Sequence, residues 1–341
     1  MFRNSALLKI VPSPSRRRWK SRGTLKRSRF ITDAIVAGGL TAAMGTRAAA
    51  QDATPLNAAG VMNETAALLF YAADMGFYEK GGVHVNASVL SNSGAISSAI
   101  AAGAIQVGSF AISVGALARQ RGVPLVLIAP AGLYLSTTPT SGLIVRKDSP
   151  YNKAADLNGK TIAVRDLANM SYYGAKQWMD KNGGDSKSVK WIEIPDTSVV
   201  PALQAGRFDA ASISEPALGD AIHGGDMRSL ASVFDAIGKR FLISGYFMNE
   251  DFAKAHPDLV RKFADVINST AVWANRNLPA SAKILEKYTH VPVPAGSPRV
   301  TFADRLQSAD VQPVLDVMYN YGSLKAPMRA KDMFSAIIPA Q

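Results

Sequence analysis

The 341-residue chain contains no cysteine. This absence excludes disulfides, thiolate zinc sites, iron–sulfur clusters and cysteine nucleophiles. It also excludes a lipid-modified cysteine as a membrane anchor. Histidine is scarce, and the four histidines, His84, His223, His256 and His290, are scattered with no pair at metal-ligand spacing. We therefore expect neither a metal site nor a cofactor.

The sequence also gives little support for a serine hydrolase. Such an enzyme needs a serine, a histidine and an acid, and many carry the serine in a Gly-x-Ser-x-Gly turn. The sequence has no such turn, and Ser244 precedes Gly245 without the rest of the pattern. We therefore expect a protein that is not an enzyme.

Acidic residues are nearly absent from the first fifty positions. This segment holds eleven of the 38 Lys and Arg residues but only one of the 26 Asp and Glu residues, Asp33. Residues 51–341 hold 27 basic and 25 acidic side chains, so most of the net charge of +12 lies in the first fifty residues. A nearly neutral body lacks the basic surface that binds nucleic acid, and we expect no nucleic-acid partner.

The first fifty residues have the pattern of an export signal. A basic stretch precedes the mostly apolar residues 30–44, and Ala48 and Ala50 supply the small side chains that signal peptidase requires. We predict cleavage before Gln51 and a periplasmic protein. The apolar stretch is short for a membrane span, although an uncleaved anchor remains an alternative. The arginines at 16–18 leave Sec and twin-arginine export both open.

The rest of the chain alternates between short apolar strands, turns and helices. Strands are expected at 83–90, 105–107, 124–129, 142–145, 160–164, 189–194, 208–213 and 229–234, and helices at 95–102, 114–121, 172–181, 199–205, 216–222, 257–275, 279–288, 302–306 and 311–321. This alternation predicts parallel sheets covered by helices on both faces. Two such units and a helical tail indicate two α/β lobes.

Turns at the carboxyl ends of the expected strands are the candidate binding elements, because open α/β sheets bind ligands there. Five of these turns offer hydroxyl or amide side chains at a helix start: 63–65, 91–94, 108–110, 166–171 and 214–216. Such turns hold an anion or a polar head group well. Ordinary N-caps use the same residue types, so each turn alone leaves both interpretations open.

Several stretches closely resemble ABC-transporter periplasmic substrate-binding proteins of the nitrate/sulfonate/taurine type, a family that is also similar to thiamin-pyrimidine synthases. They occur in the family's order, at 72–85, 101–108, 122–126, 155–164, 200–211 and at Glu215 with Pro216. The resemblance covers residues 60–225. Its most specific parts are the Asp-Leu-x-Gly-Lys stretch at 156–160 and the Gly-x-x-Asp-Ala stretch at 206–210.

The resemblance implies an α/β fold, the type II periplasmic binding protein, with two α/β lobes joined by two crossing strands. We place lobe 1 at residues 51–140 plus 246–341 and lobe 2 at residues 141–245, with crossings near 139–142 and 241–247. The implied function is capture of a small organic or oxyanionic solute by hinge closure, for delivery to an ABC permease in the inner membrane. Candidate solutes are sulfonates, taurine, nitrate or bicarbonate, a pyrimidine and aromatic carboxylates, and we expect a monomer. The alternatives are a sensor that docks on a receptor and a thiamin-pyrimidine-related enzyme, whose cysteines this chain lacks.

Within that fold, nine residues are the predicted ligand contacts: Met62, Asn63, Ser93, Ser109, Phe110, Tyr134, Asn169, Ser171 and Glu215. Structural roles compete with binding: N-capping for Ser93, core packing for Phe110, a place along the hinge for Tyr134 and helix stabilisation for Glu215. Arg165 either pairs with a carboxylate or sulfonate or faces solvent.

The sequence departs from the family pattern in two places. Gln106 stands where the family has Asp, and residues 165–171 replace a turn rich in Gly, Ser and Thr. A larger or partly apolar ligand therefore fits better than the smallest oxyanions. The apolar residues available to it are Met62, Phe110, Tyr134, Met170, Tyr172 and Tyr173.

Overall fold

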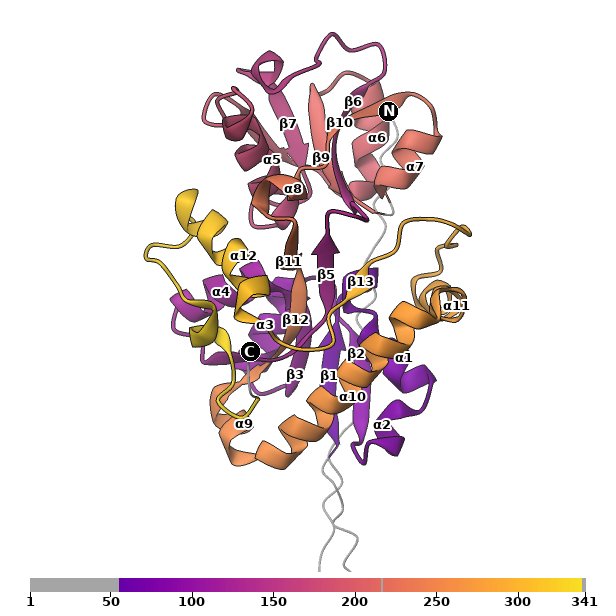
Figure 1. The fold of residues 1–341 in the computed structure, drawn as a ribbon, viewed down its shortest axis with the longest axis vertical. Coiled ribbons are helices and arrows are strands. Elements are labelled where there is room, and N and C mark those ends of the chain that lie inside the picture. The colour runs from indigo at the N-terminus through magenta and orange to yellow at the C-terminus, as the bar shows by residue number, and fades with distance from the viewer. Residues whose placement is uncertain (1–54, 216, 339–341) are drawn as a thin grey trace, which may run out of the picture. The chain divides into compact units, whose positions relative to one another are not determined.

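The computed structural model describes residues 55–215 and 217–338 (Figure 1). The predicted export signal, its cleavage site before Gln51 and Pro216 lie outside the described residues. Among the helices of the described part, none combines the length and the apolar character that a membrane crossing requires.

The first five-stranded sheet, sheet 1, has the strand order β2-β1-β3-β12-β4. Its strands are β1 (Leu56–Gly60), β2 (Val85–Val89), β3 (Val107–Ala111), β4 (Leu125–Pro130) and β12 (Ser244–Asn249). The helices between them are η1 (Glu64–Ala66), α1 (Leu68–Asp74), α2 (Phe77–Lys80), α3 (Ser93–Ala101) and α4 (Ile112–Gln120). Strand β12 runs antiparallel to both of its neighbours, whereas β1 is parallel to β2 and β3.

The second five-stranded sheet, sheet 2, has the order β10-β6-β9-β7-β8. Its strands are β6 (Ser141–Arg146), β7 (Thr161–Val164), β8 (Lys190–Glu193), β9 (Ala210–Ser214) and β10 (Met227–Ala231). Its helices are η2 (Ala154–Leu157), α5 (Met170–Lys181), α6 (Asp196–Gln204), α7 (Ala217–His223) and α8 (Phe234–Ile237). Read from the β8 edge, sheet 2 repeats sheet 1, because β6 is antiparallel to both of its neighbours while β7 is parallel to β8 and β9.

Two paired strands connect the sheets. Strand β5 (Gly132–Leu135) leads from sheet 1 toward β6, and β11 (Arg240–Leu242) leads from sheet 2 back to β12. They pair antiparallel and form a small sheet with β13 (Thr301–Phe302). Figure 1 shows β5 and β11 running between the two larger sheets. The predicted fold class is confirmed: two α/β lobes are joined by two crossing strands.

Both sheets contain the predicted parallel pairs, but each also has one antiparallel strand that was not predicted. Strands β6 and β12 are the ones that enter a sheet directly after a crossing. Each enters its sheet from the side at which the parallel strands have their carboxyl ends. Each therefore runs antiparallel to its neighbours. The crossing connections therefore impose one antiparallel strand on each sheet. The placement of the lobe limits at 140/141 and 245/246 stays a prediction.

The C-terminal part is mostly helical, with α9 (Glu250–Ala255), α10 (Pro257–Arg276), α11 (Leu278–Thr289), α12 (Ser308–Asn320) and η3 (Ala330–Met333). Helix α10 has Pro257 in its first turn and buries Val260, Phe263 and Ile267 at helical spacing. The helix predicted at 302–306 is wrong. Phe302 belongs to β13, because the backbone there pairs with β5 and buries the ring.

One hydrophobic cluster contains residues of both large sheets. It includes Leu127 of β4 and Val145 of β6, together with Tyr134 of β5, Phe241 of β11 and Leu315 of α12. Of two further clusters, one draws its strand residues from sheet 1 and from Phe302 of β13, and the other draws them from sheet 2. The crossing strands and α12 are therefore packed parts of the core.

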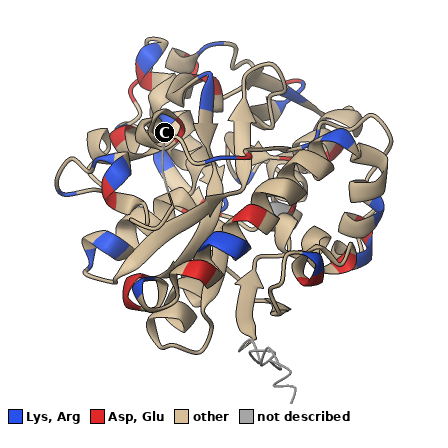
Figure 2. Cartoon of the chain, turned by 60° about the horizontal axis from the view of Figure 1, so that its bottom comes forward, with Lys and Arg blue, Asp and Glu red and all other residues tan. Residues whose placement is uncertain are grey.

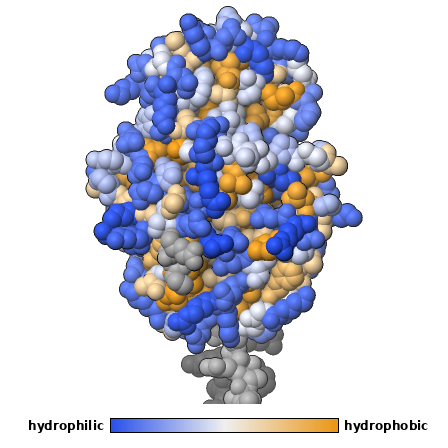
Figure 3. Space-filling view, viewed as in Figure 1, coloured by the Kyte–Doolittle hydropathy of each residue, from blue (hydrophilic) through white to orange (hydrophobic). Residues whose placement is uncertain are grey.

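The outer surface of the described residues mixes charges of both signs. Lys and Arg alternate with Asp and Glu over the visible helices (Figure 2). On the face drawn in Figure 3, apolar residues form separate small patches among hydrophilic ones. This distribution agrees with the nearly neutral composition of residues 51–341.

Candidate functional site

A cavity of about 420 Å³ lies where strand ends of both large sheets meet. We call its two sides wall 1 and wall 2. Wall 1 comprises residues 61–66, 93 and 109–111 from sheet 1 and its turns; wall 2 comprises residues 165, 169–171, 197 and 212–215 from sheet 2 and its turns. Thr140, just before β6, Ile243, between β11 and β12, and Ser244, the first residue of β12, line it as well. This is the position at which open α/β sheets bind ligands.

The polar residues after β1 on wall 1 are bonded within the protein. Oδ1 of Asn63 accepts hydrogen bonds from the Ala66 amide at 3.2 Å and from Oγ1 of Thr65 at 2.9 Å, which caps η1. The carbonyl of Thr65 accepts from Oγ of Ser244 at 2.8 Å, which ties this turn to β12.

Glu64 forms a nearly buried ion pair with Arg299. The exposed fractions of the two side chains are 14% for Glu64 and 9% for Arg299. Oε2 of Glu64 also accepts from the Val300 amide at 3.2 Å. Burial raises the pKa of Glu64, and the guanidinium of Arg299 partly offsets that increase. The carboxylate of wall 1 thus has an internal counter-ion.

Ser109 and Phe110 lie within β3, because the strand predicted at 105–107 actually spans Val107–Ala111. Both residues line the cavity, and both are almost fully buried. The Phe110 ring stacks on Phe247 of β12 with a centroid distance of 4.4 Å. Phe110 therefore combines the predicted place at the cavity with the core-packing role that was its alternative.

The first turn of α5 forms the centre of wall 2. Oδ1 of Asn169 accepts from the Tyr172 amide at 2.9 Å and so caps α5. Oγ of Ser171 lies 3.0 Å from Oγ of Ser214, and Oγ of Ser212 donates to the Ser171 carbonyl at 2.9 Å. These bonds fix the start of α5 against the end of β9.

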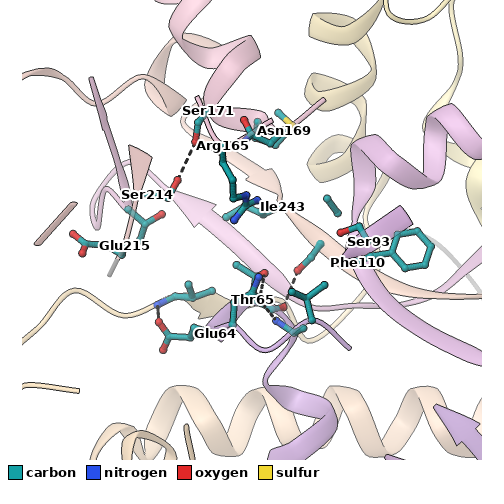
Figure 4. Close-up of a pocket in the computed structure, with 18 of the residues that line it drawn as sticks. Glu64, Thr65, Ser93, Phe110, Arg165, Asn169, Ser171, Ser214, Glu215 and Ile243 are labelled. Atoms are coloured by element: carbon teal, nitrogen blue, oxygen red, sulfur yellow. Dashed lines mark hydrogen bonds between the residues drawn. The ribbon is translucent and has the colours of Figure 1, made fainter. Parts of the chain in front are cut away.

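Arg165 follows β7 and lines the cavity with a side chain that is 52% exposed. Its Nε lies 3.4 Å from Oδ2 of Asp166. Figure 4 shows the guanidinium directed from wall 2 toward the part of the cavity that holds Thr65 and Ile243. Of the two orientations that the sequence left open, the structure has the one that reaches the cavity.

Glu215 follows β9 and is half-buried at the cavity. Its Oε2 accepts from the Gly219 amide at 2.9 Å. Burial raises the pKa of Glu215, and the charges of Asp220 and of Glu64 raise it further. The Gly219 hydrogen bond and the charge of His223 lower it. Within residues 55–215 and 217–338, Glu215 takes part in no ion pair.

Eight of the nine predicted contact residues line this cavity: Met62, Asn63, Ser93, Ser109, Phe110, Asn169, Ser171 and Glu215. Their role in binding stays a prediction.

Tyr134 is not among the lining residues, which corrects its expected place. It is fully buried on β5, its hydroxyl donates to Oδ1 of Asp235 at 2.8 Å and lies 2.9 Å from Oγ of Ser232, and its ring packs on Phe234 and Phe241. This matches its alternative role along the crossing strands.

Sequence reasoning missed several lining residues. Thr197 stands in the first turn of α6, directly after β8, so the strand-end rule applied to that turn would have found it. Thr140 precedes β6 and Ser244 begins β12, so neither lies at the carboxyl end of a strand, where the rule would have found it. Asn92, rather than Ser93, caps α3 by accepting from the Ala95 amide at 2.9 Å.

Among the described residues, no group of three His, Asp or Glu side chains is placed to hold a metal ion.

Residues 63–280 match the model of the family described as NMT1/THI5 like. The taurine-binding periplasmic protein of Escherichia coli K12 is 27% identical over 195 residues, which make up 56% of this chain and 58% of that protein. The chain thus matches somewhat more than half the length of this relative.

Solved structures of periplasmic binding proteins share the fold. The periplasmic aliphatic sulphonate binding protein of Escherichia coli gives a TM-score of 0.69 at 16% identity, covering 82% of this chain and 97% of that chain. The periplasmic nitrate-binding protein of Synechocystis PCC 6803 gives a TM-score of 0.68 at 15% identity. The match covers 84% of this chain and 87% of that chain. The resemblance to substrate-binding proteins of the nitrate/sulfonate/taurine type is confirmed by these matches.

Proposed function

This chain belongs to the NMT1/THI5-like family, and on that premise we propose that it captures a small organic anion and delivers it to an ABC permease of the inner membrane. The observation that carries the proposal is the composition of the cavity, in which strand ends and helix starts of both lobes converge around Arg165. We also propose that the protein acts in the periplasm as a monomer, after cleavage before Gln51.

The electrostatics of the cavity favour an anion. Helices α3, α4, α5 and α6, of nine to twelve residues each, begin at or beside the cavity. The N-terminus of a helix carries a partial positive charge and unpaired amide donors. The guanidinium of Arg165 adds a full charge and a planar pair of donors that match a carboxylate or a sulfonate.

The size of the cavity favours an organic anion over nitrate. A volume of about 420 Å³ falls within the range of pockets that enclose organic ligands. Apolar surface is present as well, from Met62, Phe110 and Met170. Sulfonates, taurine and aromatic carboxylates therefore fit the cavity better than nitrate does.

Hinge closure is the mechanism that follows from the two-walled site. A ligand that contacts both walls stabilises the arrangement in which the walls are close, and so shifts an open–closed equilibrium. The paired strands β5 and β11 would absorb the change in angle, since they link the sheets. We do not propose catalysis, because the taurine and sulphonate relatives are binding proteins.

Thermal-shift and calorimetric titration with alkanesulfonates, taurine, nitrate and benzoates tests the proposal. We expect one organic anion to raise the melting temperature by mass action, to bind with a stoichiometry near one and to be recovered unchanged. Small-angle scattering with that ligand should show compaction. Lack of stabilisation by every anion, or chemical conversion of the bound compound, would contradict the proposal.

A further inference from the structure

We propose that residues 321–325, which we call the bridging segment, control the ligand affinity of the cavity without lining it. The segment bonds to helix α5 from sheet 2 and to helix α4 from sheet 1, and so holds the two walls in the arrangement that binds a ligand. The inference rests on the proposed function, because it concerns the closure of the same site. It makes Tyr321 and Ser323 positioning residues, and neither is among the lining residues of the cavity.

Helix α5 joins the cavity to the bridging segment. Residues 169–171, at the start of this helix, line wall 2. Tyr173, Lys176 and Asp180 follow at spacings of three and four residues, so they lie on one face of the helix. All three contact the bridging segment. Because a helix of this length is a stiff rod about 18 Å long, a shift at that face also moves the start of α5 at the cavity.

The contacts on the sheet 2 side are direct. The hydroxyl of Tyr173, a fully buried residue, donates to Oγ of Ser323 at 2.8 Å. The hydroxyl of Tyr321 donates to Oδ2 of Asp180 at 2.7 Å. Nζ of Lys176 lies 4.8 Å from the centre of the Tyr321 ring, within the range of a cation–π contact. The bridging segment is therefore fastened to α5 at both Tyr321 and Ser323.

The same segment is bonded to the sheet 1 side through Gln120, the last residue of α4. Nε2 of Gln120 donates to the Ser323 carbonyl at 3.2 Å, and its Oε1 accepts from the Lys325 amide. Ser323 thus carries one hydrogen bond to each side, from its hydroxyl oxygen to α5 and from its carbonyl to α4. In Figure 1, α12 lies between α4 and α5, and the bridging segment follows its end.

Helix α12 fixes the bridging segment to the crossing strands. The carboxylate of Asp310, in the first turn of α12, is almost fully buried and accepts two hydrogen bonds from Arg240 of β11. Nε donates at 2.7 Å and Nη2 at 2.9 Å. Such a bidentate pair fixes orientation as well as distance. The start of α12 is therefore held at the connection between the sheets, and its far end carries the bonds to α4 and α5.

Separation of the walls breaks this connection. A rotation of sheet 2 away from sheet 1 carries α5 away from α4, and Ser323 cannot follow both helices. Hydrogen bonds are lost once the donor and acceptor are more than about 3.5 Å apart. The bonds of the bridging segment therefore stabilise the closed arrangement. A ligand that needs both walls binds with an apparent affinity that rises with the population of that arrangement.

A purely stabilising role for the bridging segment is the competing explanation. Tyr321→Phe removes the hydroxyl bonded to Asp180 and keeps the ring. Gln120→Met removes the bonds on the other side and keeps the length of the side chain. Tyr319→Phe is the matched control, because it removes a hydroxyl from an exposed tyrosine of α12. A stabilising role alone would lower the melting temperature of the first two variants without changing the separation of the walls.

The lack of cysteine allows that separation to be measured without a ligand. Ser91→Cys and Ser198→Cys place spin labels on exposed positions, in the turn after β2 and in the first turn of α6. Pulsed electron spin resonance then gives the distribution of distances between the labels. We expect Tyr321→Phe and Gln120→Met to shift this distribution toward longer separations. Tyr319→Phe should leave it as in the labelled protein without further substitution.

Calorimetry with taurine, ethanesulfonate and benzoate gives the second readout. For each of these anions that binds the wild type, the dissociation constant should rise about threefold or more in Tyr321→Phe and in Gln120→Met. It should stay unchanged in Tyr319→Phe. The double variant should be only slightly weaker than the single variants, because either substitution releases the same connection.

Unchanged or shorter separations in both variants would overturn the inference. So would longer separations that leave the affinity for a bound anion unchanged, or equal effects in Tyr319→Phe. Failure of all anions to bind would remove the proposed function and the effect on affinity with it, whereas the separations would still decide whether the bridging segment holds the walls together. Tyr321→Phe decides the question even if Gln120→Met does not fold.

Discussion

Wall 1 and wall 2 come from sheets with the same strand order, and each has an asparagine that caps its own helix, Asn63 and Asn169. Their charged side chains differ: on wall 1, Glu64 is paired with Arg299. On wall 2, Arg165 is half-exposed toward the cavity and Glu215 has no ion-pair partner among the described residues. We infer that wall 1 is chiefly a preformed surface and that wall 2 supplies most of the charge that recognises a ligand.

The difference does not arise from topology. Each sheet has one antiparallel strand between parallel neighbours, and each directs its strand ends to the cavity. The contrast comes from particular side chains, above all from Arg299, which reaches Glu64 from the segment after α11. Substitutions that remove these side chains can therefore test the comparison without altering the fold.

The largest effect is expected from removing the internal counter-ion of wall 1. Arg299→Met leaves the Glu64 carboxylate buried and unpaired, and should lower the free energy of unfolding by about 3–5 kcal/mol. Arg305→Met, which removes an exposed arginine beside Asp304, should change it by less than about 0.5 kcal/mol. Urea unfolding measures both. If Arg299→Met costs no more than Arg305→Met, Glu64 does not depend on its partner.

The next effect concerns the cation of wall 2. Arg165→Gln should weaken the binding of any organic anion about 30-fold or more, because a charge-assisted pair of hydrogen bonds is lost. Its stability should change little, since the side chain is half-exposed. Arg207→Gln, an exposed arginine before β9, is the control and should bind normally. Equal affinities of the two variants would show that recognition does not use Arg165.

A smaller effect is expected at the start of α5. Asn169→Ala removes the acceptor that caps this helix and should cost about 1 kcal/mol of stability. Asn169→Asp keeps an acceptor and the stability, but it adds a negative charge at the cavity and should weaken anion binding. Thermal unfolding and calorimetry of the two variants separate capping from binding. Normal anion affinity in Asn169→Asp would place the ligand away from α5.

The smallest effect is a pH dependence. Burial raises the pKa of Glu215 above its usual 4.5, so the folded state favours the protonated carboxyl. Its contribution to stability is therefore greatest below that pH and is lost as the pH rises through the folded-state pKa. The melting temperature of the ligand-free wild type, relative to Glu215→Gln, should fall between pH 4.5 and neutrality. A relative increase would mean that the favourable charge of His223 outweighs burial at Glu215.

The sequence predicts the architecture because strand and helix periodicity are local properties. The turns after β1, β2, β7 and β9 were predicted as candidate binding elements, and the cavity lies at those strand ends. The fifth predicted turn, at 108–110, lies within β3 but also lines the cavity. The prediction was wrong where pairing overrode local pattern, as at Phe302, whose backbone bonds to β5 instead of forming a helix.

Long-range contacts explain the rest of what the sequence left hidden. Glu64 and Arg299 are 235 residues apart, and no local pattern indicates that they pair. The direction of the Tyr134 side chain depends on how β5 packs against Phe234 and Phe241. Both are contacts between residues far apart in the sequence, which local patterns do not indicate.

Helix α12 lies late in the chain, yet its Leu315 and Met318 share one core cluster with Leu127 of sheet 1 and Val145 of sheet 2. The hydroxyl of Tyr173 on α5 also donates to Oγ of Ser323, just after α12. Because a ribosome makes the chain from its N-terminus, both large sheets emerge before helix α12 does. The shared core cluster therefore cannot reach its native packing until residues 308–323 have been synthesised.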